Sequence, residues 1–244
     1  MTLAVVGTLA VGVSGLGIRA HRAVAAEEER TRQSWILDAA LARGAQALLS
    51  PGDSLIELLR AGEPARWQFG GRQLMIEVTA ESGKVDVNAG DPDLVRALLE
   101  RTLNTQDAAA ASANLRRARA AAAQISSVEQ ILPVADRFGE KAARLRRVLT
   151  SYSGQAAVSI ESATPALLEA LGMQREAGGS AESRERPLAV PIASNALERP
   201  IYTIYASFDG EASARAREMT IILNPTTRAF FLIDKREGVR ITAR

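Results

Sequence analysis

The first fifty residues place the tightest limit on what this chain can fold into. Thr2–Ile18 carry no charged side chain, and a run of that length is at the lower edge of what spans a bilayer. Ala23–Leu49 contain no proline and one glycine, and they are rich in good helix formers. Ser50–Asp53, which includes proline and glycine, is a helix stop. The sequence therefore predicts a membrane anchor that continues into one long helix over residues 1–50.

Other interpretations of this segment stay open. A cleaved signal peptide would use Ala23–Ala25 as its small-residue site, although no basic segment precedes the apolar run. A strand–turn–helix opening a nucleotide-binding fold is a second alternative, although the glycines do not follow the G-x-G-x-x-G spacing. Two separate helices of a soluble domain are the third. Within the second half, Trp35, Ala39, Ala42, Ala45 and Leu49 recur at helical spacing and predict one apolar face.

The rest of the chain alternates between strand and helix patterns. Period-two patterns separated by turn residues predict antiparallel strands near residues 66–69, 72–80, 84–88, 201–208, 218–223 and 229–233. Between the two groups of strands, caps and apolar spacing predict helices from Asp91 to Gly172, including helices opened by Asp91-Pro92 and Thr164-Pro165. The order favours an α+β fold in which a small helical domain is inserted into an antiparallel sheet domain.

We divide the chain on this basis. The predicted parts are the anchor and long helix (1–50), the first part of the α+β domain (51–90), the inserted helical domain (91–175), a linker (176–199) and the second part of the α+β domain (200–244).

The residue composition excludes several classes of enzyme site. The chain has no Cys and one His, His21, so thiolate metal sites and HExxH zinc sites are excluded. A Ser/His/Asp triad would have to use His21, which lies in the basic stretch after the apolar run. Glu77, Glu81 and Asp86 are the carboxylates that a hydrolase could pair. Neighbouring positions of a strand point to opposite faces, however, so we expect no enzyme.

Three local patterns resemble the type II secretion system protein K (GspK) family of minor pseudopilins. Leu41–Leu49, L-A-R-G-A-Q-A-L-L, is similar to the end of that family's long helix. Ile76–Asn88 resembles the family's hairpin with its E-S-G-K-apolar-x-apolar-Asn sequence, and this is the most specific match. Ser127–Val134 and Val158–Leu168 are similar to two stretches of the family's inserted helical domain, which is of the SAM or helix-hairpin-helix type.

The resemblance implies a pseudopilin-like sheet and a role at the tip of a short periplasmic pseudopilus, where the protein would help to initiate assembly for export across the outer membrane. The implied partners are minor pseudopilins of the I and J types and the inner-membrane secretion platform. The implied localisation is the inner membrane, with a single pass and the globular part in the periplasm. Trp35, Ala39, Ala42 and Leu49 are the candidate partner-binding residues. The alternative is that they only pack on the chain's own sheet.

Some positions depart from the family's pattern. Family members begin with a basic leader, whereas here the apolar run follows Met1, so we expect either an upstream start or different processing. Arg19 and Arg22 after the run oppose an exported body by the positive-inside rule. Members of the family can bind calcium, and one loop here offers hard oxygen ligands in Asp86, Asn88, Asp91 and Asp93. Helix capping by Asp91 and Asp93 is the interpretation that we favour, and we expect no cofactor.

The main rival function is DNA binding by a helix-hairpin-helix-like module. The predicted helical domain carries a group of basic residues: Arg116, Arg117, Arg119, Lys141, Arg144, Arg146 and Arg147. Hairpins of that kind present glycine-rich turns to phosphate, whereas Pro133–Phe138 contains no glycine and one acidic residue. The chain's net charge of +2 also gives no general attraction to nucleic acid, so we expect none to bind.

Overall fold

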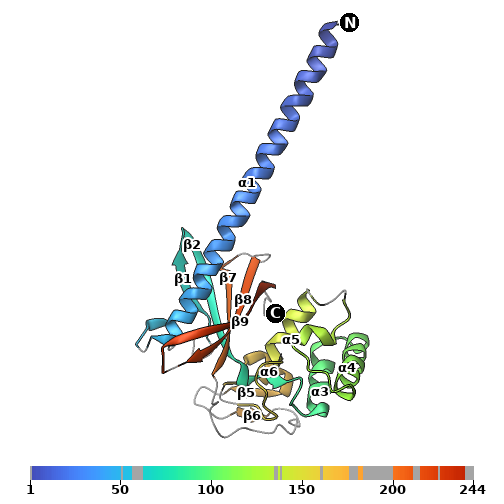
Figure 1. The fold of residues 1–244 in the computed structure, drawn as a ribbon, viewed down its shortest axis with the longest axis vertical. Helices are drawn as coiled ribbons and strands as arrows, with labels where there is room; N and C mark the ends of the chain where they lie inside the picture. The colour runs from blue at the N-terminus through green and yellow to red at the C-terminus, as the bar shows by residue number, and fades with distance from the viewer. Residues whose placement is uncertain are drawn as a thin grey trace.

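The structure, a computed structural model, is of the α+β class. It describes residues 2–50, 52–56, 63–134, 137, 139–159, 162–175, 181–183, 200–210, 215–224 and 226–239, with backbone alone for 2–19, 174–175, 181–183 and 238–239. An antiparallel sheet lies against one end of a long helix, and a group of shorter helices lies on the other side of the sheet (Figure 1).

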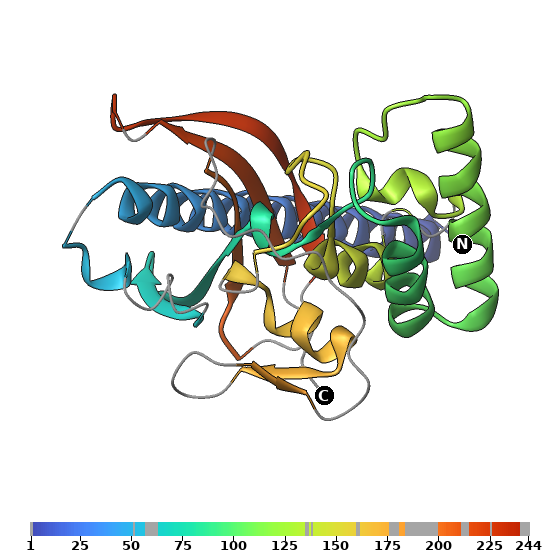
Figure 2. The ribbon, with the colours of Figure 1, turned by 90° about the horizontal axis from the view of Figure 1, so that it is seen from below.

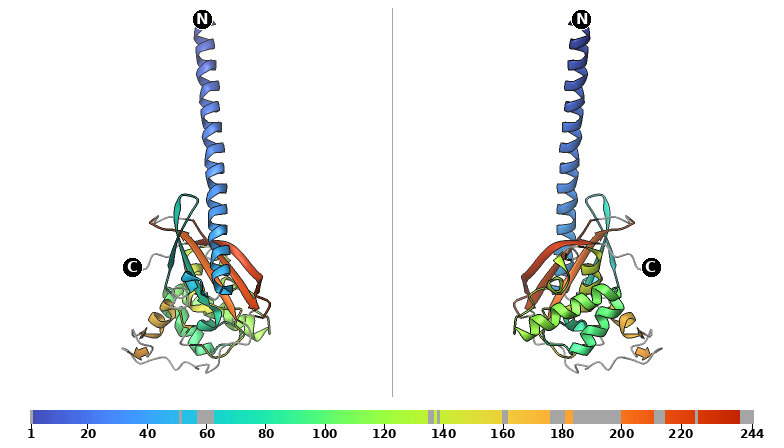
Figure 3. Two further views of the ribbon diagram at one scale, coloured as in Figure 1. Left: turned by 90° about the vertical axis from the view of Figure 1, so that its left-hand side faces the viewer. Right: turned by 90° about the vertical axis from the view of Figure 1, so that its right-hand side faces the viewer.

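Helix α1 is the longest element and spans Thr2–Leu49. Its N-terminal part extends away from the rest of the molecule, and only its C-terminal part lies on the sheet (Figure 3). Buried side chains on α1 accordingly begin at Ile36. A search of the described residues finds no helix with the length and apolar character needed to cross a membrane. The anchor predicted over Thr2–Ile18 lies outside the residues whose side chains the structure describes.

The sheet has five antiparallel strands in the order β1-β2-β7-β8-β9. These strands are Ala65–Phe69, Arg72–Ala80, Ile201–Phe208, Arg215–Asn224 and Ala229–Val239. They confirm the strands predicted from residues 66–69, 72–80, 201–208, 218–223 and 229–233, and the last two extend further than predicted. A tight turn joins β1 to β2 through Gly70 and Gly71, whose φ angles of 58° and 74° suit a two-residue hairpin. Strand β7 pairs with β2, so the residues between them leave the sheet and return to its centre.

The prediction of an antiparallel sheet strand at residues 84–88 is wrong. Strand β3 spans only Val85–Asp86 and pairs in parallel with β4, Leu149–Thr150, rather than with β2. The expected hairpin turn is a buried 3-10 turn, η1, over Glu81–Gly83. The alternating valines that suggested a sheet strand are both fully buried in the helical part of the molecule. Pairing with β2 and pairing with β4 would both bury alternate residues, so the sequence pattern could not distinguish the two partners.

The helices between β2 and β7 form a separate group. They are α3 (Pro92–Thr102), α4 (Thr105–Ala120), the 3-10 turn η2 (Val128–Ile131), α5 (Glu140–Val148) and α6 (Pro165–Leu171). Two predicted caps are present: Asp91 accepts hydrogen bonds from the Asp93 and Leu94 amides, and Thr164 accepts one from the Leu167 amide. A capping box expected from Ser126 to Glu129 is not formed, because η2 has no side-chain hydrogen bond at its N-cap. A small hairpin of β5 (Met173–Arg175) and β6 (Ala181–Ser183) follows α6. Apart from β6, the predicted linker at 176–199 lies outside the described residues.

The buried apolar side chains form two hydrophobic clusters that share no residue. One cluster lies between α1 and the sheet and includes Leu37, Leu41, Ile76, Ile204 and Ile221. The other lies among the helices between β2 and β7, from Val85 to Leu171. We refer to residues 85–173 as the helical unit and to α1 with the five strands as the sheet unit. In the view from below, α1 runs across the picture and α3 and α4 of the helical unit lie to one side of the sheet (Figure 2).

Candidate partner interface

Helix α1 packs closely on the sheet through small side chains. Ala40, Ala45 and Ala47 are fully buried against the strands. At Gly44 a Cβ atom would lie 2.8 Å from Cγ2 of Ile204 and 3.2 Å from Cγ2 of Ile76. The helix backbone and the strands are therefore as close as a glycine allows, which fixes the side of α1 that the sheet uses.

The predicted partner-binding residues lie along one side of α1 but are covered to different degrees. Trp35 is 71% exposed, Ala42 is exposed and Ala39 is half-buried. Leu49 instead packs against the sheet core. The structure thus leaves Trp35 and Ala42 available to another molecule and directs Leu49 inward. Their role in partner binding stays a prediction.

Sequence reasoning missed a groove next to Trp35. It lies between α1 and the β1–β2 hairpin and is lined by Val24, Glu27, Glu28, Thr31, Arg32, Trp35, Ile36 and Phe69. Phe69, 44% exposed, stacks on Trp67 with ring centroids 4.9 Å apart. Arg72 links the hairpin to α1 through an ion pair with Glu29, at 3.1 Å. The hairpin therefore widens the apolar surface that begins on the helix.

A second exposed apolar stretch lies on the edge strand β9. Phe230, Phe231, Leu232 and Ile233 are consecutive, and each is at least 37% exposed. One edge of β9 pairs with β8, and in the strand order of the sheet no strand follows it. Four adjacent apolar side chains on an edge strand are unusual in a protein that stays alone in solution. This run of apolar residues could have indicated an exposed edge only if the strand order had been known.

The segment that most resembles the family motif has a structural role at the base of the helical unit. Lys84 is buried and donates to Oε1 of Glu81 at 2.5 Å, and the Thr203 hydroxyl donates to the same oxygen at 2.7 Å. At Gly83 a Cβ atom would lie 1.8 Å from the carbonyl oxygen of Ser162. Glu81 therefore connects the end of β2 to β7, and Gly83 packs the turn against the helical unit.

Asp86 and Asn88 complete this base. The buried Asp86 carboxylate accepts hydrogen bonds from the Asn88 and Ala89 amides through Oδ1 and from the Ser153 hydroxyl and Gly154 amide through Oδ2. Asn88 exchanges two hydrogen bonds with the backbone of Ile125. In the part of the chain that the structure describes, no group of three or more His, Cys, Asp or Glu side chains could hold a metal ion. The structure thus assigns capping roles to these residues, and calcium binding stays a prediction.

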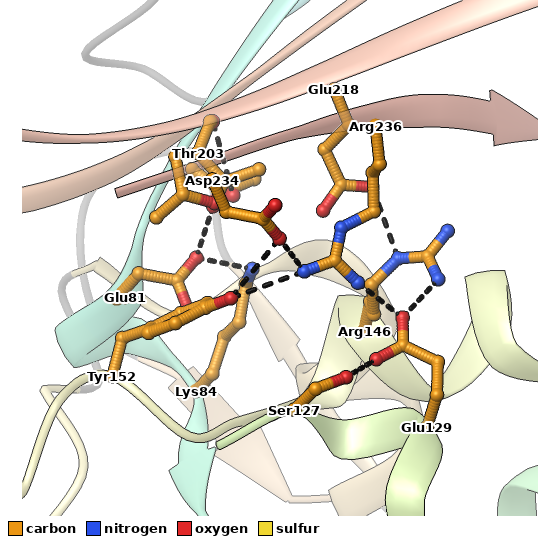
Figure 4. Close-up of polar contacts among 12 residues, drawn as sticks. Glu81, Lys84, Ser127, Glu129, Arg146, Tyr152, Thr203, Glu218, Asp234 and Arg236 are labelled. Atoms are coloured by element: carbon orange, nitrogen blue, oxygen red, sulfur yellow. Dashed lines mark hydrogen bonds and ion pairs between the residues drawn. The ribbon is translucent and has the colours of Figure 1, made fainter. Parts of the chain in front are cut away.

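An ionic junction connects the helical unit to the sheet unit (Figure 4). From α5, Arg146 donates to Oε2 of Glu218 on β8 at 3.0 Å, and Arg147 makes two hydrogen bonds to Glu77 on β2, at 2.9 and 3.2 Å. In the opposite direction, Arg236 of β9 donates to Glu129 of η2. We call these six residues the junction. Every charge in it has a partner of opposite sign.

Glu129 is the centre of the junction. Its carboxylate lies between Arg146 and Arg236 and also accepts a hydrogen bond from the Ser127 hydroxyl. Burial alone would raise its pKa, but the Ser127 hydrogen bond and the charges of Arg236 and Arg146 outweigh burial and lower the pKa below its usual value. Next to it the Tyr152 hydroxyl donates to Asp234 at 3.2 Å. Glu129 is therefore charged at neutral pH despite being buried.

The basic residues that suggested DNA binding are mostly engaged within the protein. Arg119 donates to the carbonyl oxygens of Val87 and Gly90, and Lys141 pairs with Asp107. Arg144 pairs with Glu140, and Arg146 and Arg147 belong to the junction. Arg116 and Arg117 are exposed, and the predicted turn at 133–138 lies partly outside the described residues. The arrangement disfavours a phosphate-binding face on α5.

The carboxylates considered for catalysis are likewise occupied. Glu77 binds Arg147, Glu81 binds Lys84 and Thr203, and Asp86 caps two loops. Each of them therefore has a structural partner in place of a second carboxylate, and paired-carboxylate hydrolysis gains no support.

Comparison with solved structures finds chains of similar fold. No protein-family model matches the sequence, and no curated protein matches it. A chain in the crystal structure of the GspK-GspI-GspJ complex from the enterotoxigenic Escherichia coli type 2 secretion system is similar. It is 13% identical, has a TM-score of 0.49, and the match covers 87% of this chain and 98% of that chain. A likeness of this degree carries no inference about function.

Proposed function

We propose that this chain is a minor pseudopilin of a type II secretion system, similar to protein K. In this role it helps to initiate the pseudopilus at its tip, so that proteins are exported across the outer membrane. The support comes from the sequence motifs and from the shape and surface of the chain itself.

The observation that carries the proposal is that one side of helix α1 is buried on the sheet while another side exposes apolar residues. Its C-terminal part is packed on the sheet through alanines and Gly44, whereas Val24 and Trp35 are 56% and 71% exposed. The exposed side continues onto Phe69 and forms the groove next to the β1–β2 hairpin. A helix that extends beyond its own domain with an apolar side exposed is suited to pack against helices of other subunits.

The other parts of the proposal concern location and architecture. Thr2–Ile18 anchor the chain in the inner membrane in a single pass, and the sheet and helical units lie in the periplasm. The helical unit is a domain inserted between β2 and β7. The partners are minor pseudopilins of the I and J types and the inner-membrane secretion platform. The chain is not an enzyme and takes neither a cofactor nor nucleic acid.

An export assay tests this function. In a strain that lacks this chain, the wild-type gene should restore release of a type II substrate into the medium, and Trp35→Glu should not. The Trp35 side chain is mostly exposed, so the substitution should leave the fold intact. Trp35→Phe is the matched control, because it keeps an aromatic surface, and should restore release.

Three results would contradict the proposal. Normal release in the deletion strain would remove the role in export. Normal release with Trp35→Glu combined with Ala42→Glu would exclude the exposed side of α1 as the interface. Equal loss of release with Trp35→Phe would show that the helix does not act through an apolar contact.

A further inference from the structure

We propose that the helical unit is a hinged arm, which the ionic junction locks against the sheet and which can be released while both hydrophobic clusters stay folded. The inference concerns the internal mechanics of the chain and does not depend on the proposed function.

The first observation is the division of the apolar interior. The cluster of the helical unit contains residues from Val85 to Leu171, and the cluster of the sheet unit contains residues from α1, β1, β2, β7 and β8. The two clusters share no residue. Each unit therefore has the apolar burial that a folded body needs, and neither depends on the other for its core.

The second observation is the polar character of the surface between the units. The pairs Arg146–Glu218, Arg147–Glu77 and Arg236–Glu129 all cross from one unit to the other. Their side chains are between 9% and 31% exposed, so solvent reaches them only in part. Buried ion pairs specify one geometry well but contribute little net stability, since desolvation offsets most of the attraction. Such a surface holds one orientation and separates more readily than an apolar core.

A third observation is a cavity of about 40 Å³ inside the junction. Its lining includes Glu77, Lys84, Arg146, Arg147 and Glu218, together with the Tyr205 side chain. Protein cores rarely leave space larger than a water molecule. The contact between the units therefore leaves space that side chains do not fill, as expected for a docking surface.

The point of rotation follows from the base of the helical unit. Strand β2 ends at Ala80, and the η1 turn that follows is attached to the helical unit by the Ser159 amide, which donates to the Ser82 carbonyl at 2.9 Å. Gly83 is in close contact with the backbone of Ser162. Ser82 and Gly83 therefore move with the helices, whereas the Glu81 side chain stays hydrogen-bonded to Thr203 of β7, so the pivot lies between Glu81 and Ser82. The three arginine pairs fix the angle of the arm about that pivot.

A distance measurement between two spin labels tests the proposal. The chain has no native cysteine, so the full-length protein can carry labels at Gln68→Cys on β1 and Arg116→Cys on α4, both exposed. With the junction intact we expect one narrow distance distribution. Arg147→Glu places two acidic groups together at Glu77 and should broaden the distribution, and Glu129→Gln should broaden it through loss of the central charge.

Two further variants make the result specific. The exchanged pair Glu77→Arg with Arg147→Glu should restore the narrow distribution, because the attraction returns with opposite polarity. Arg144→Glu changes charge on the same helix but only at the exposed Arg144–Glu140 pair, and should leave the distribution narrow. In every variant, hydrogen exchange should show both clusters protected as in the wild type.

Three outcomes would overturn the proposal. A narrow, unchanged distribution for both Arg147→Glu and Glu129→Gln would show that the ion pairs do not hold the arm. Loss of hydrogen-exchange protection in both clusters would show that docking and folding are a single event. Failure of the exchanged pair to restore the distance, with Arg144→Glu equally broad, would assign the effect to general charge.

Discussion

Replacing Gly83 by alanine should destabilise the protein markedly, because the new Cβ would lie 1.8 Å from the Ser162 carbonyl oxygen and 2.3 Å from its carbon. Both are backbone atoms, so no side chain can rotate to make room. A carbon and a carbonyl oxygen normally stay about 3.3 Å apart, and the two segments must therefore separate by roughly 1.5 Å. That shift breaks the hydrogen bond from the Ser159 amide to the Ser82 carbonyl, now 2.9 Å long.

The expected cost follows from these two effects. Overpacking a well-filled site costs about 1–3 kcal/mol, and the lost hydrogen bond adds about 1 kcal/mol. Together they predict a loss of about 2–4 kcal/mol, or roughly 5–15 °C in melting temperature for a chain of this size. Urea unfolding followed by circular dichroism measures the change. Gly139→Ala is the control, since nothing lies within 4 Å of its Cβ position, and should change stability by less than about 1 kcal/mol. Equal stability of the two variants would refute the close packing of η1.

Three more measurements test other parts of the account. Gly44→Leu should cost about 1–3 kcal/mol, because its side chain must displace Ile204 where α1 meets the sheet, and unchanged urea unfolding would contradict that packing. The lowered pKa of Glu129 means that its stabilising contribution is present above its usual value of 4.5 and is lost as the pH falls through the lowered pKa. The unfolding free energy of Glu129→Gln should therefore fall less than that of the wild type below pH 4.5, and parallel curves would contradict this. Calcium should not raise the melting temperature, because both oxygens of Asp86 already accept hydrogen bonds, and a rise would restore the calcium site.

Local patterns in the sequence were sufficient for most elements. Caps such as Asp91 and Thr164 depend on neighbours three residues away, so their signals are visible in the sequence. The β1–β2 hairpin could be predicted for the same reason, since Gly70 and Gly71 fall between two alternating runs. In each of these cases the interaction that forms the element is short in sequence.

Contacts between distant residues were not predictable in this way. Strand β3 pairs with Leu149 and Thr150, and no pattern around Val85 distinguishes that partner from β2. The junction joins Arg146 to Glu218, which are 72 positions apart. In the sequence alone, these charged residues therefore cannot be distinguished from ordinary surface residues. A periodic pattern cannot identify such partners, because it records only whether a side chain is buried.

The candidate interface on α1 was predictable only in part, for a related reason. Apolar and small residues lie on two sides of this helix, and helical spacing alone does not say which side contacts the sheet. Trp35, Ala42 and Leu49 lie on the same side, yet Trp35 and Ala42 are exposed, whereas Leu49, at the end of the helix, contacts the core. The groove next to Trp35 also needs Phe69, which reaches it only through the fold of the hairpin.

The most direct test of the central claim is site-specific cross-linking of α1 in cells. Ala42→Cys places the only thiol of the chain on the exposed side of the helix, and Ala40→Cys places it on the side buried against the sheet. With matching cysteines in the α1-type helices of the I and J pseudopilins, Ala42→Cys should form a disulfide-linked product and Ala40→Cys should not. Cross-linking of neither, or of both equally, would contradict the assignment of this side of α1 to partner binding.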